Sequence, residues 1–579
     1  MSIFESLGGN EYQPLNMTYR PPTKETFVTG RTTTRWSPTS GSTYSAANSR
    51  VITFRLNGSE LLDGNSCYLN MVMSTPRGHV VPEDLAPLSI LSACRVTISG
   101  SQAEQFSNAA DAIKPLVYVA SDAQYLSNNA SVTMGSWLYR SSPGIGIQAN
   151  GSNAIGAVVD GATGIGGDAA VQVSSLGLKA NESYKYVGNT WRRNSFPAGF
   201  QATTLNANTR FTGRQTRGID MQGVALSIPL GIIFGLFRTS QLLPLRVMGA
   251  IEITIELNPP SRALIVCQPL TYTAAGNSIS ETAASNPPDT YVLDYQLSQL
   301  SITGDLVAIS PAMAASLDAL AAGEEGVSLV IDSLATTLYP SQPNASQQSL
   351  VTTRPHSNLT SQTITIKPSV GANSPYWPKS FYFGGSTFVS MQTQIGGLNY
   401  PAQAVNSLSQ AWLELRKALA GSRGVSLDRG SAIDVSAYSC TFGCPMGVWS
   451  SALRGAAPDI TELTGVDGGT VPDDIAKAKF ANTIASMSPA CFVLGQSFSR
   501  VIGSEQETSL SGANSRLSGY SCQTNLQFRP YVKGTATDPL TNPANSLDSA
   551  LFGTPLDFLV TQTISILIRV AQSSVMISD

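Results

Sequence analysis

The clearest pattern in the chain is a stretch in which hydrophobic and polar residues alternate, strictly so from residue 251 onward. One face carries Ile251, Ile253, Ile255 and Leu257, and the opposite face carries Glu252, Thr254 and Glu256. Alternation of β-branched residues with a period of two predicts a half-buried β-strand. Pro259 and Pro260 then end the strand, because proline cannot donate a hydrogen bond to a sheet.

A second strand of the same kind lies near residue 570. Ile564, Ile566, Ile568 and Val570 fall on one of its faces. Each of these isoleucine-rich faces needs a second sheet packed against it. Two closing strands of one kind, about half a chain apart, therefore predict two β domains of one kind.

The first half of the chain shows further strand signals and one helix signal. Strands are predicted at residues 50–56, 67–73, 94–99 and within 210–226. A helix is predicted from Ala103 to Ile113, because Phe106, Ala109, Ala110 and Ile113 are spaced by three and four residues. Pro115 is expected to end or kink this helix.

The second half repeats this order of elements. Strands are predicted at residues 291–297, 300–302 and 389–395, the last followed by a Gly396-Gly397 turn. One helix is predicted to begin at Ser310, with Pro311 in its first turn, and to end at Gly323. Another is predicted to carry Val405, Leu408, Ala411, Trp412, Leu415 and Leu419 on one face and to end at Gly421.

This order of elements predicts a mainly β protein of antiparallel sandwiches or jelly rolls with short helices in the connections. We divide the chain into an N-terminal extended arm (1–47), a first jelly roll (48–260), a linker (261–290) and a second jelly roll (291–579). Long loop regions are expected at about 141–190 and 421–488, because they are rich in small and polar residues or lack strand signals.

The composition supports a multi-domain protein with extensive interfaces. At 579 residues the chain exceeds what one core usually supports. Only 13% of its residues are charged, so the cost of desolvating its surface against neighbours is low. The net charge of −3 gives no basic field for non-specific binding of nucleic acid.

The seven cysteines are scattered and odd in number, which argues against a disulfide framework. The first nine residues lack the basic and apolar regions of a secretory signal. The longest apolar run, 223–237, is too short and too interrupted to span a membrane. We therefore expect a soluble protein kept in a reducing compartment.

Residues that could carry chemistry are few. The two histidines, His79 and His356, both lie in loop contexts, where we expect them to be exposed. The sequence contains no Gly-x-Ser-x-Gly, no His-Glu-x-x-His and no Walker A loop. We expect no catalytic, cofactor-binding or metal-binding residues and no enzymatic activity.

Three weaker motifs suggest chemistry, but each has a simpler explanation. Cys440 and Cys444 could form half of a zinc site, but no second pair lies near in sequence. The glycine-rich stretch 161–167 lacks the βαβ context of a phosphate-binding loop, so a flexible loop explains it better. Asp473 and Asp474 follow Pro472 and are expected to complement a helix dipole.

Four segments resemble double jelly-roll major capsid proteins, of the kind found in Polinton-like viruses, virophages and the adenovirus–tectivirus lineage of double-stranded DNA viruses. They are Ser45–Met73, 228–259, 298–323 and Ile564–Val570. They occur in the family's order and cover about half of the chain. The resemblance implies two consecutive eight-stranded antiparallel jelly rolls.

The resemblance also implies a structural virion protein. Three chains would form a homotrimer, a pseudo-hexameric capsomer that tiles an icosahedral shell around a DNA genome. Its partners would be neighbouring capsomers, penton proteins and minor or cement capsid proteins, without sequence-specific contact to nucleic acid. The arm at 1–47 would reach a neighbour or lie under the shell; contact with DNA or an internal membrane stays open.

Two other classes of function stay open on the sequence alone. One is a carbohydrate-binding β-sandwich of a surface protein, which needs an export signal and exposed aromatic side chains. The other is an enzyme on a jelly-roll scaffold. A cupin needs a histidine-rich metal motif, whereas a glycosidase needs two facing carboxylates, which a sequence cannot exclude.

Overall fold

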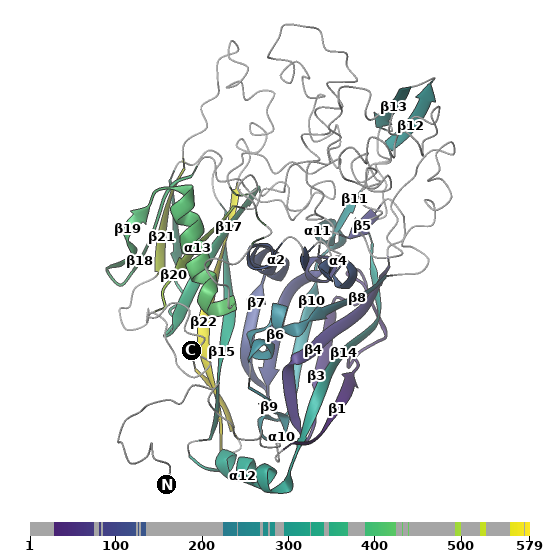
Figure 1. Cartoon of the computed structure of the whole chain (residues 1–579), viewed down its shortest axis with the longest axis vertical. Helices are drawn as coiled ribbons and strands as arrows, with labels where there is room; N and C mark the ends of the chain where they lie inside the picture. Colours follow the sequence, from purple (N-terminus) through teal and green to yellow (C-terminus); the bar gives the residue numbers. More distant parts are fainter. Residues whose placement is uncertain are drawn as a thin grey trace, which may run out of the picture.

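The structure is a computed structural model of the whole chain. It describes residues 28–74, 80–82, 85–122, 125–126, 129–134, 224–239, 241–266, 270–275, 278–283, 294–324, 326–340, 347–368, 388–423, 431, 433, 438, 492–499, 522–528, 556–572 and 574–578. The described residues form two β-sandwiches that lie side by side, the first purple to teal and the second green to yellow in Figure 1. All the strand pairs are antiparallel.

The first sandwich consists of two sheets. One has the order β1-β14-β4-β8, in which β2 also pairs with β14 and β9 also pairs with β4. The other has the order β3-β10-β6-β7. Their bounds are β1 Val28–Trp36, β2 Thr43–Tyr44, β3 Val51–Leu56, β4 Leu61–Ser74, β6 Leu91–Ile98, β7 Ser101–Ser107, β8 Val224–Pro229, β9 Leu243–Pro244, β10 Ile251–Leu257 and β14 Gln296–Ile309. The alternate apolar side chains of β4, β3 and β10 are buried between the two sheets.

The second sandwich has the strand order of a jelly roll. Its sheets run β15-β22-β17-β20, with β23 added beside β22, and β16-β21-β18-β19. The bounds are β15 Val327–Pro340, β16 Gln347–Thr352, β17 Leu359–Pro368, β18 Phe388–Ile395, β19 Leu398–Val405, β20 Val493–Ser497, β21 Cys522–Phe528, β22 Leu556–Ala571 and β23 Ser574–Ser578. Numbered from β15 to β22, the two orders are 1-8-3-6 and 2-7-4-5, which confirms the predicted jelly roll here.

The two predicted closing strands occupy equivalent places. In the first sandwich β10 lies between β3 and β6, and Ile253 pairs with Phe54 on one side and Val96 on the other. In the second, β22 lies between β15 and β17. The pairing of β4 with β8 likewise matches that of β16 with β21. The prediction of two β domains of one kind is therefore confirmed.

The structure places β1 and β14 differently from the predicted division of the chain. β14 follows the expected linker, but it lies between β1 and β4 in the first sandwich. β1 and β2 fall within the expected arm, yet Trp36 and Tyr44 are buried. The prediction missed this because β1 is exposed over most of its length and shows no hydrophobic period. Of the predicted arm, residues 1–27 lie outside the described residues.

The helix predicted at Ala103–Ile113 is wrong in its first half. Residues 101–107 form β7, and the helix α2 spans Ala109–Ala120. Asn108 separates them with a φ of 49°, a left-handed conformation that asparagine tolerates better than most residues. Pro115 does not end the helix, because α2 is buried along nearly all of its length and packing outweighs the lost hydrogen bond.

Two helices of the second half are confirmed. α12 spans Pro311–Ala322, and the Ser310 hydroxyl caps it by accepting a hydrogen bond of 3.4 Å from the Met313 amide. α13 spans Leu408–Arg423, so it continues two residues past the predicted end at Gly421, and it covers one face of the sheet that contains β17 and β20. Val405, which we placed on this helix, belongs instead to β19, an exposed edge strand whose Pro401 hides the strand pattern.

The expected linker also contains regular structure. Its elements are α11 Pro260–Ala263, β11 Leu264–Val266, which pairs with β5 Val80–Pro82, and the hairpin of β12 Leu270–Ala275 with β13 Ser278–Ala283. The remaining short helices are α1 Ala86–Ser89, α4 Asn129–Thr133, α9 Leu230–Ile233, η4 Gly235–Arg238 and α10 Leu245–Met248. Within the described ranges, no helix is both long and apolar enough to cross a lipid bilayer. The loop region 141–190 and most of 421–488 lie outside those ranges.

One glycine allows the two sandwiches to approach each other closely. Gly235 begins η4 in the first half, and a Cβ atom placed on it would overlap the backbone carbonyl oxygen of Asp332 in β15. A backbone atom cannot rotate away as the end of a side chain can. The contact between η4 and β15 therefore requires glycine at this position.

We predict that Gly235→Ala will destabilise the folded chain by ~1–3 kcal/mol, because the backbones of the two sandwiches must move apart. The midpoint of denaturant unfolding measures this change. Gly30→Ala is the matched control, since a Cβ at Gly30 meets nothing within 4 Å. Equal midpoints for the two variants would contradict the inferred contact.

Candidate functional site at the junction of the two sandwiches

The two sandwiches meet along the edges of two sheets. β7 is the last strand of its sheet and β15 the first strand of another, and the two lie side by side. The Thr336 hydroxyl accepts a hydrogen bond from the Ser107 amide at 3.1 Å and donates one to the Ser107 carbonyl at 2.8 Å. Each edge strand thus shields the other from pairing with a foreign strand.

A buried carboxylate lies beside this contact. Glu104 of β7 is 1% exposed, and it accepts hydrogen bonds from the backbone amides of Gly235 at 3.0 Å and Leu236 at 2.8 Å. Burial raises the pKa of Glu104 to about 7, although the two amides and the nearby Arg238 favour the charged form. Asp332 of the second sandwich raises this pKa further. Glu104 therefore connects a sheet edge to the short helix that contacts β15.

A buried ion pair joins the two halves at α2. Lys367 of β17 contacts the carboxylate of Asp111, and the two residues are 8% and 9% exposed. Burial would raise the pKa of Asp111, but Lys367, Arg262 and Lys114 outweigh it and hold the pKa below its ordinary value. These residues line a cavity of about 20 Å³, which is room for about one water molecule.

The other end of α2 also receives a charge from the second half. Arg416 of α13 is 1% exposed, and its guanidinium donates a hydrogen bond of 3.1 Å to the carbonyl of Val119. The Ser431 hydroxyl donates to the neighbouring carbonyl of Tyr118 at 3.5 Å. A cation at a helix C-terminus interacts favourably with the helix dipole, and it can donate hydrogen bonds to the last carbonyls, which have no partner within the helix. Partners from the second half therefore reach both ends of α2.

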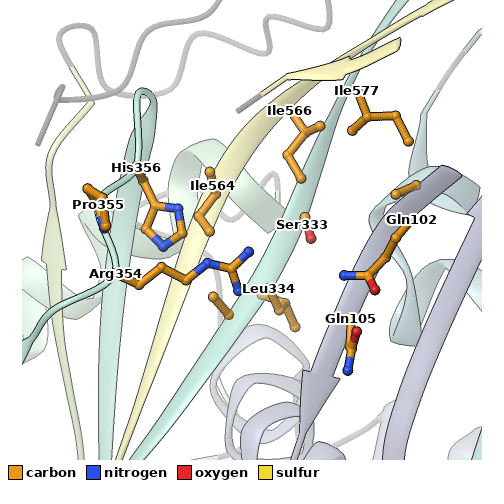
Figure 2. Close-up of a pocket in the computed structure, with 12 residues that line it drawn as sticks. Gln102, Gln105, Ser333, Leu334, Arg354, Pro355, His356, Ile564, Ile566 and Ile577 are labelled. Carbon is orange, nitrogen blue, oxygen red and sulfur yellow. The ribbon is translucent and has the colours of Figure 1, made fainter. Parts of the chain in front are cut away.

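A pocket of about 380 Å³ opens between the two halves (Figure 2). It is lined by Gln102, Ala103, Gln105, Ser333, Leu334, Ala335, Arg354, Pro355, His356, Ile564, Ile566 and Ile577. Figure 2 shows His356 and Arg354 on the loop that follows β16, across the pocket from the amides of Gln102 and Gln105 on β7. The lining combines these polar groups with the aliphatic side chains of Leu334, Ile564, Ile566 and Ile577.

The structure describes only one of the candidate residues weighed from the sequence. His356 lies in a loop as predicted, but it is 1% exposed, so the prediction that it is exposed is wrong. It is covered because its loop turns inward against β22 at the junction. Cys440, Cys444 and His79, with the segments 161–167 and 473–474, lie outside the described residues.

Three cysteines are described, and all three are free and buried. Burial raises the pKa of Cys67 and of Cys522 to about 12, and it raises that of Cys94 as well. Such thiols stay protonated and are poor nucleophiles and metal ligands. Within the part of the chain that the structure describes, no cluster of three or more His, Cys, Asp or Glu side chains could hold a metal ion.

The buried charges of the junction were not predicted from the sequence. Asp111 and Lys114 lie in an apolar stretch and Glu104 in a polar one, so the sequence pattern does not show that all three are buried. The partner of Asp111 is 256 residues away in the chain, so no local pattern could identify it. Asp111 and Lys367 pair across the two halves and so help to hold the two sandwiches in a fixed relative position.

No family model and no curated protein matches the sequence. Among solved structures, the chain is similar to PBCV-1 VP54 fitted into a reconstruction of the virophage Sputnik, with 10% identity, a TM-score of 0.49 and coverage of 97% of this chain and 98% of that chain. For the structure of the Sputnik virophage the identity is 12% and the TM-score 0.47, with coverage of 98% of this chain and 92% of that chain. For the mavirus major capsid protein the identity is 10% and the TM-score 0.43, with coverage of 98% of this chain and 95% of that chain.

Glu104 predicts a specific dependence of stability on pH. Its pKa in the folded chain, about 7, lies above its ordinary value of 4.5, so folding favours the protonated form. Its contribution is complete below pH 4.5, falls between pH 4.5 and 7, and is lost above pH 7. Relative to Glu104→Gln, the unfolding free energy of the unsubstituted chain should fall by roughly 3 kcal/mol across this window.

Denaturant unfolding at pH 4.5, 6 and 8 would measure this difference. Glu252→Gln, on the exposed face of β10, is the control and should follow the unsubstituted chain at every pH. If Glu104→Gln also parallels the unsubstituted chain, the carboxylate does not titrate in this window.

Lys367→Met should destabilise the chain by ~3 kcal/mol or more, because it leaves the Asp111 carboxylate buried without its nearest cation. The matched control is Lys417→Met, which removes the ion pair of Lys417 with Glu414. Because the Lys417 side chain is 36% exposed, this substitution should lower the unfolding free energy by less than ~1 kcal/mol. Unfolding midpoints of both variants give the comparison. A loss for Lys367→Met no larger than the control's would show that the junction does not depend on this pair.

Proposed function

We propose that this chain is a structural virion protein, the major capsid protein of an icosahedral DNA virus. The observation that carries the proposal is the repeated architecture. Two sandwiches have their closing strands in equivalent central places, and they are held together by paired edges and buried charges. Such a two-lobed block is what a shell subunit needs, because its task is complementary edges rather than chemistry.

The sequence resemblance supports the proposal at matching places in the fold. The segment Ser45–Met73 contains β3 and most of β4, and the segment 228–259 contains all of β10 near its end. The segment 298–323 contains most of β14 and all of α12, and Ile564–Val570 lies in β22. The resembling residues thus include the opening and closing strands of the first sandwich and the closing strand of the second. We place the boundary between the two jelly rolls after β14.

The proposed assembly unit is a homotrimer. Three chains with two sandwiches each give six lobes, so a trimer can occupy a hexagonal position in a lattice. The low fraction of charged residues, 13%, favours burial of its sides against neighbouring capsomers. Penton and minor capsid proteins would complete the shell of the virion. The proposal gives this chain the class of role that the name of the mavirus major capsid protein states for that protein.

No specific observation favours the carbohydrate-binding alternative. A sugar platform uses several exposed aromatic side chains, and among the described residues the exposed large hydrophobic side chains include one aromatic, Tyr68. Binding of the purified protein to a glycan array would nonetheless favour that alternative over a shell subunit.

The purified full-length chain should form a trimer in solution. Three chains of 60.9 kDa give about 183 kDa, which light scattering coupled to size-exclusion chromatography measures directly. Negative-stain images should show particles with a hexagonal outline. A stable particle of one chain mass at tens of micromolar would contradict the proposed role.

A further inference from the structure

The helix α12 presents an apolar surface without a partner among the described residues. Only Ser316 and Asp318 of its twelve residues are polar, yet Ala321 is its one buried residue. Met313 is 38% exposed and Leu320 is 49% exposed. Figure 1 shows α12 at the lower end of the molecule, beneath the sandwiches.

The attachments of α12 leave this surface open. The Ala321 carbonyl accepts a hydrogen bond from the Gln572 amide at 2.9 Å, and Asp318 pairs with Arg246 at 2.8 Å. The Ser316 hydroxyl donates to the Ala312 carbonyl within the helix. A helix of three turns usually takes most of its stability from packing of an apolar face. An apolar helix held at so few points indicates a further element that covers it.

The course of the chain points to one segment that could cover it. Val28, the first residue of β1, pairs with Ile309, which directly precedes the Ser310 cap of α12. The described chain therefore enters the first sandwich, at Val28, beside the start of α12. A helix of twelve residues is ~18 Å long, a distance that about six extended residues span. Twenty-seven residues are ample to reach along the helix and back.

The composition of this segment suits an apolar surface. It carries hydrophobic side chains in two groups, Ile3, Phe4 and Leu7 near its start and Leu15, Met17 and Tyr19 further on. Its first nineteen residues include two charged side chains, Glu5 and Glu11, and no basic one. The exposed Arg246 beside α12 is a cation that such a segment can approach without repulsion.

We propose that residues 1–27 bind to the exposed apolar surface of α12 in their own chain, through one of these two hydrophobic groups. The contact buries Met313 and Leu320. It gives the N-terminal segment a place on the molecule itself, at the end where β14 leads into α12. This inference does not depend on the proposed capsid role, since an isolated chain would make the same contact.

Hydrogen exchange of the full-length chain tests the contact. We compare the exchange of the α12 amides in the unsubstituted chain with two double variants, Phe4→Asp with Leu7→Asp and Leu15→Asp with Met17→Asp. At least one of them should raise the exchange rate of α12 about tenfold. Met576→Asp, at an apolar residue of β23 that is 50% exposed, is the control and should leave α12 unchanged. No change in either double variant would overturn the proposal.

A photo-crosslinking residue at position 320 tests whether the contact lies within one chain. The expected adduct joins position 320 to a residue between 1 and 27, and it migrates with the mass of one chain on a denaturing gel. An adduct with the mass of two chains would show that a second copy supplies the segment, and it would overturn the proposal. Adducts that map elsewhere, or the absence of an adduct, would overturn it as well. The trimer measurement is independent of all these outcomes.

Discussion

In each sandwich, the closing isoleucine-rich strand pairs between an earlier strand and a middle strand of its sheet. β10 completes the ladder between β3 and β6, and β22 completes the one between β15 and β17. Without its closing strand, each sheet would separate into two parts with unpaired edges, and the isoleucine row that fills the core would be absent. The core, the junction and the outer strands all depend on this central insertion.

The contacts at the junction fix the position of the two sandwiches relative to each other. Buried charges are costly unless they are paired and hydrogen-bonded, and Asp111 and Lys367 meet that condition across the two halves. Asp111 and Lys367 join α2 to β17, while Arg416 binds the opposite end of the same helix. Groups of this kind give little net stability over apolar residues, but they restrict the halves to one relative position.

The parts of the fold that could be predicted are those with local signals. The closing strands have a period of two, and α12 has a serine cap and a proline in its first turn. The boundary between β7 and α2 was missed because a single left-handed residue, Asn108, changes a strand into a helix within one residue. The candidate site was missed for a different reason: its groups, such as Glu104 and Lys367, become partners only through contacts between distant parts of the chain.

The place of β14 bears on the order in which the protein can be made. Because β14 is inserted between β1 and β4, the first strand of the described chain has no ladder partner until residue 309 has been synthesised. By then β10 and the whole segment that follows it have been synthesised. The N-terminal sandwich therefore cannot finish folding during translation of its own half, and β1 must wait through more than 250 residues of elongation.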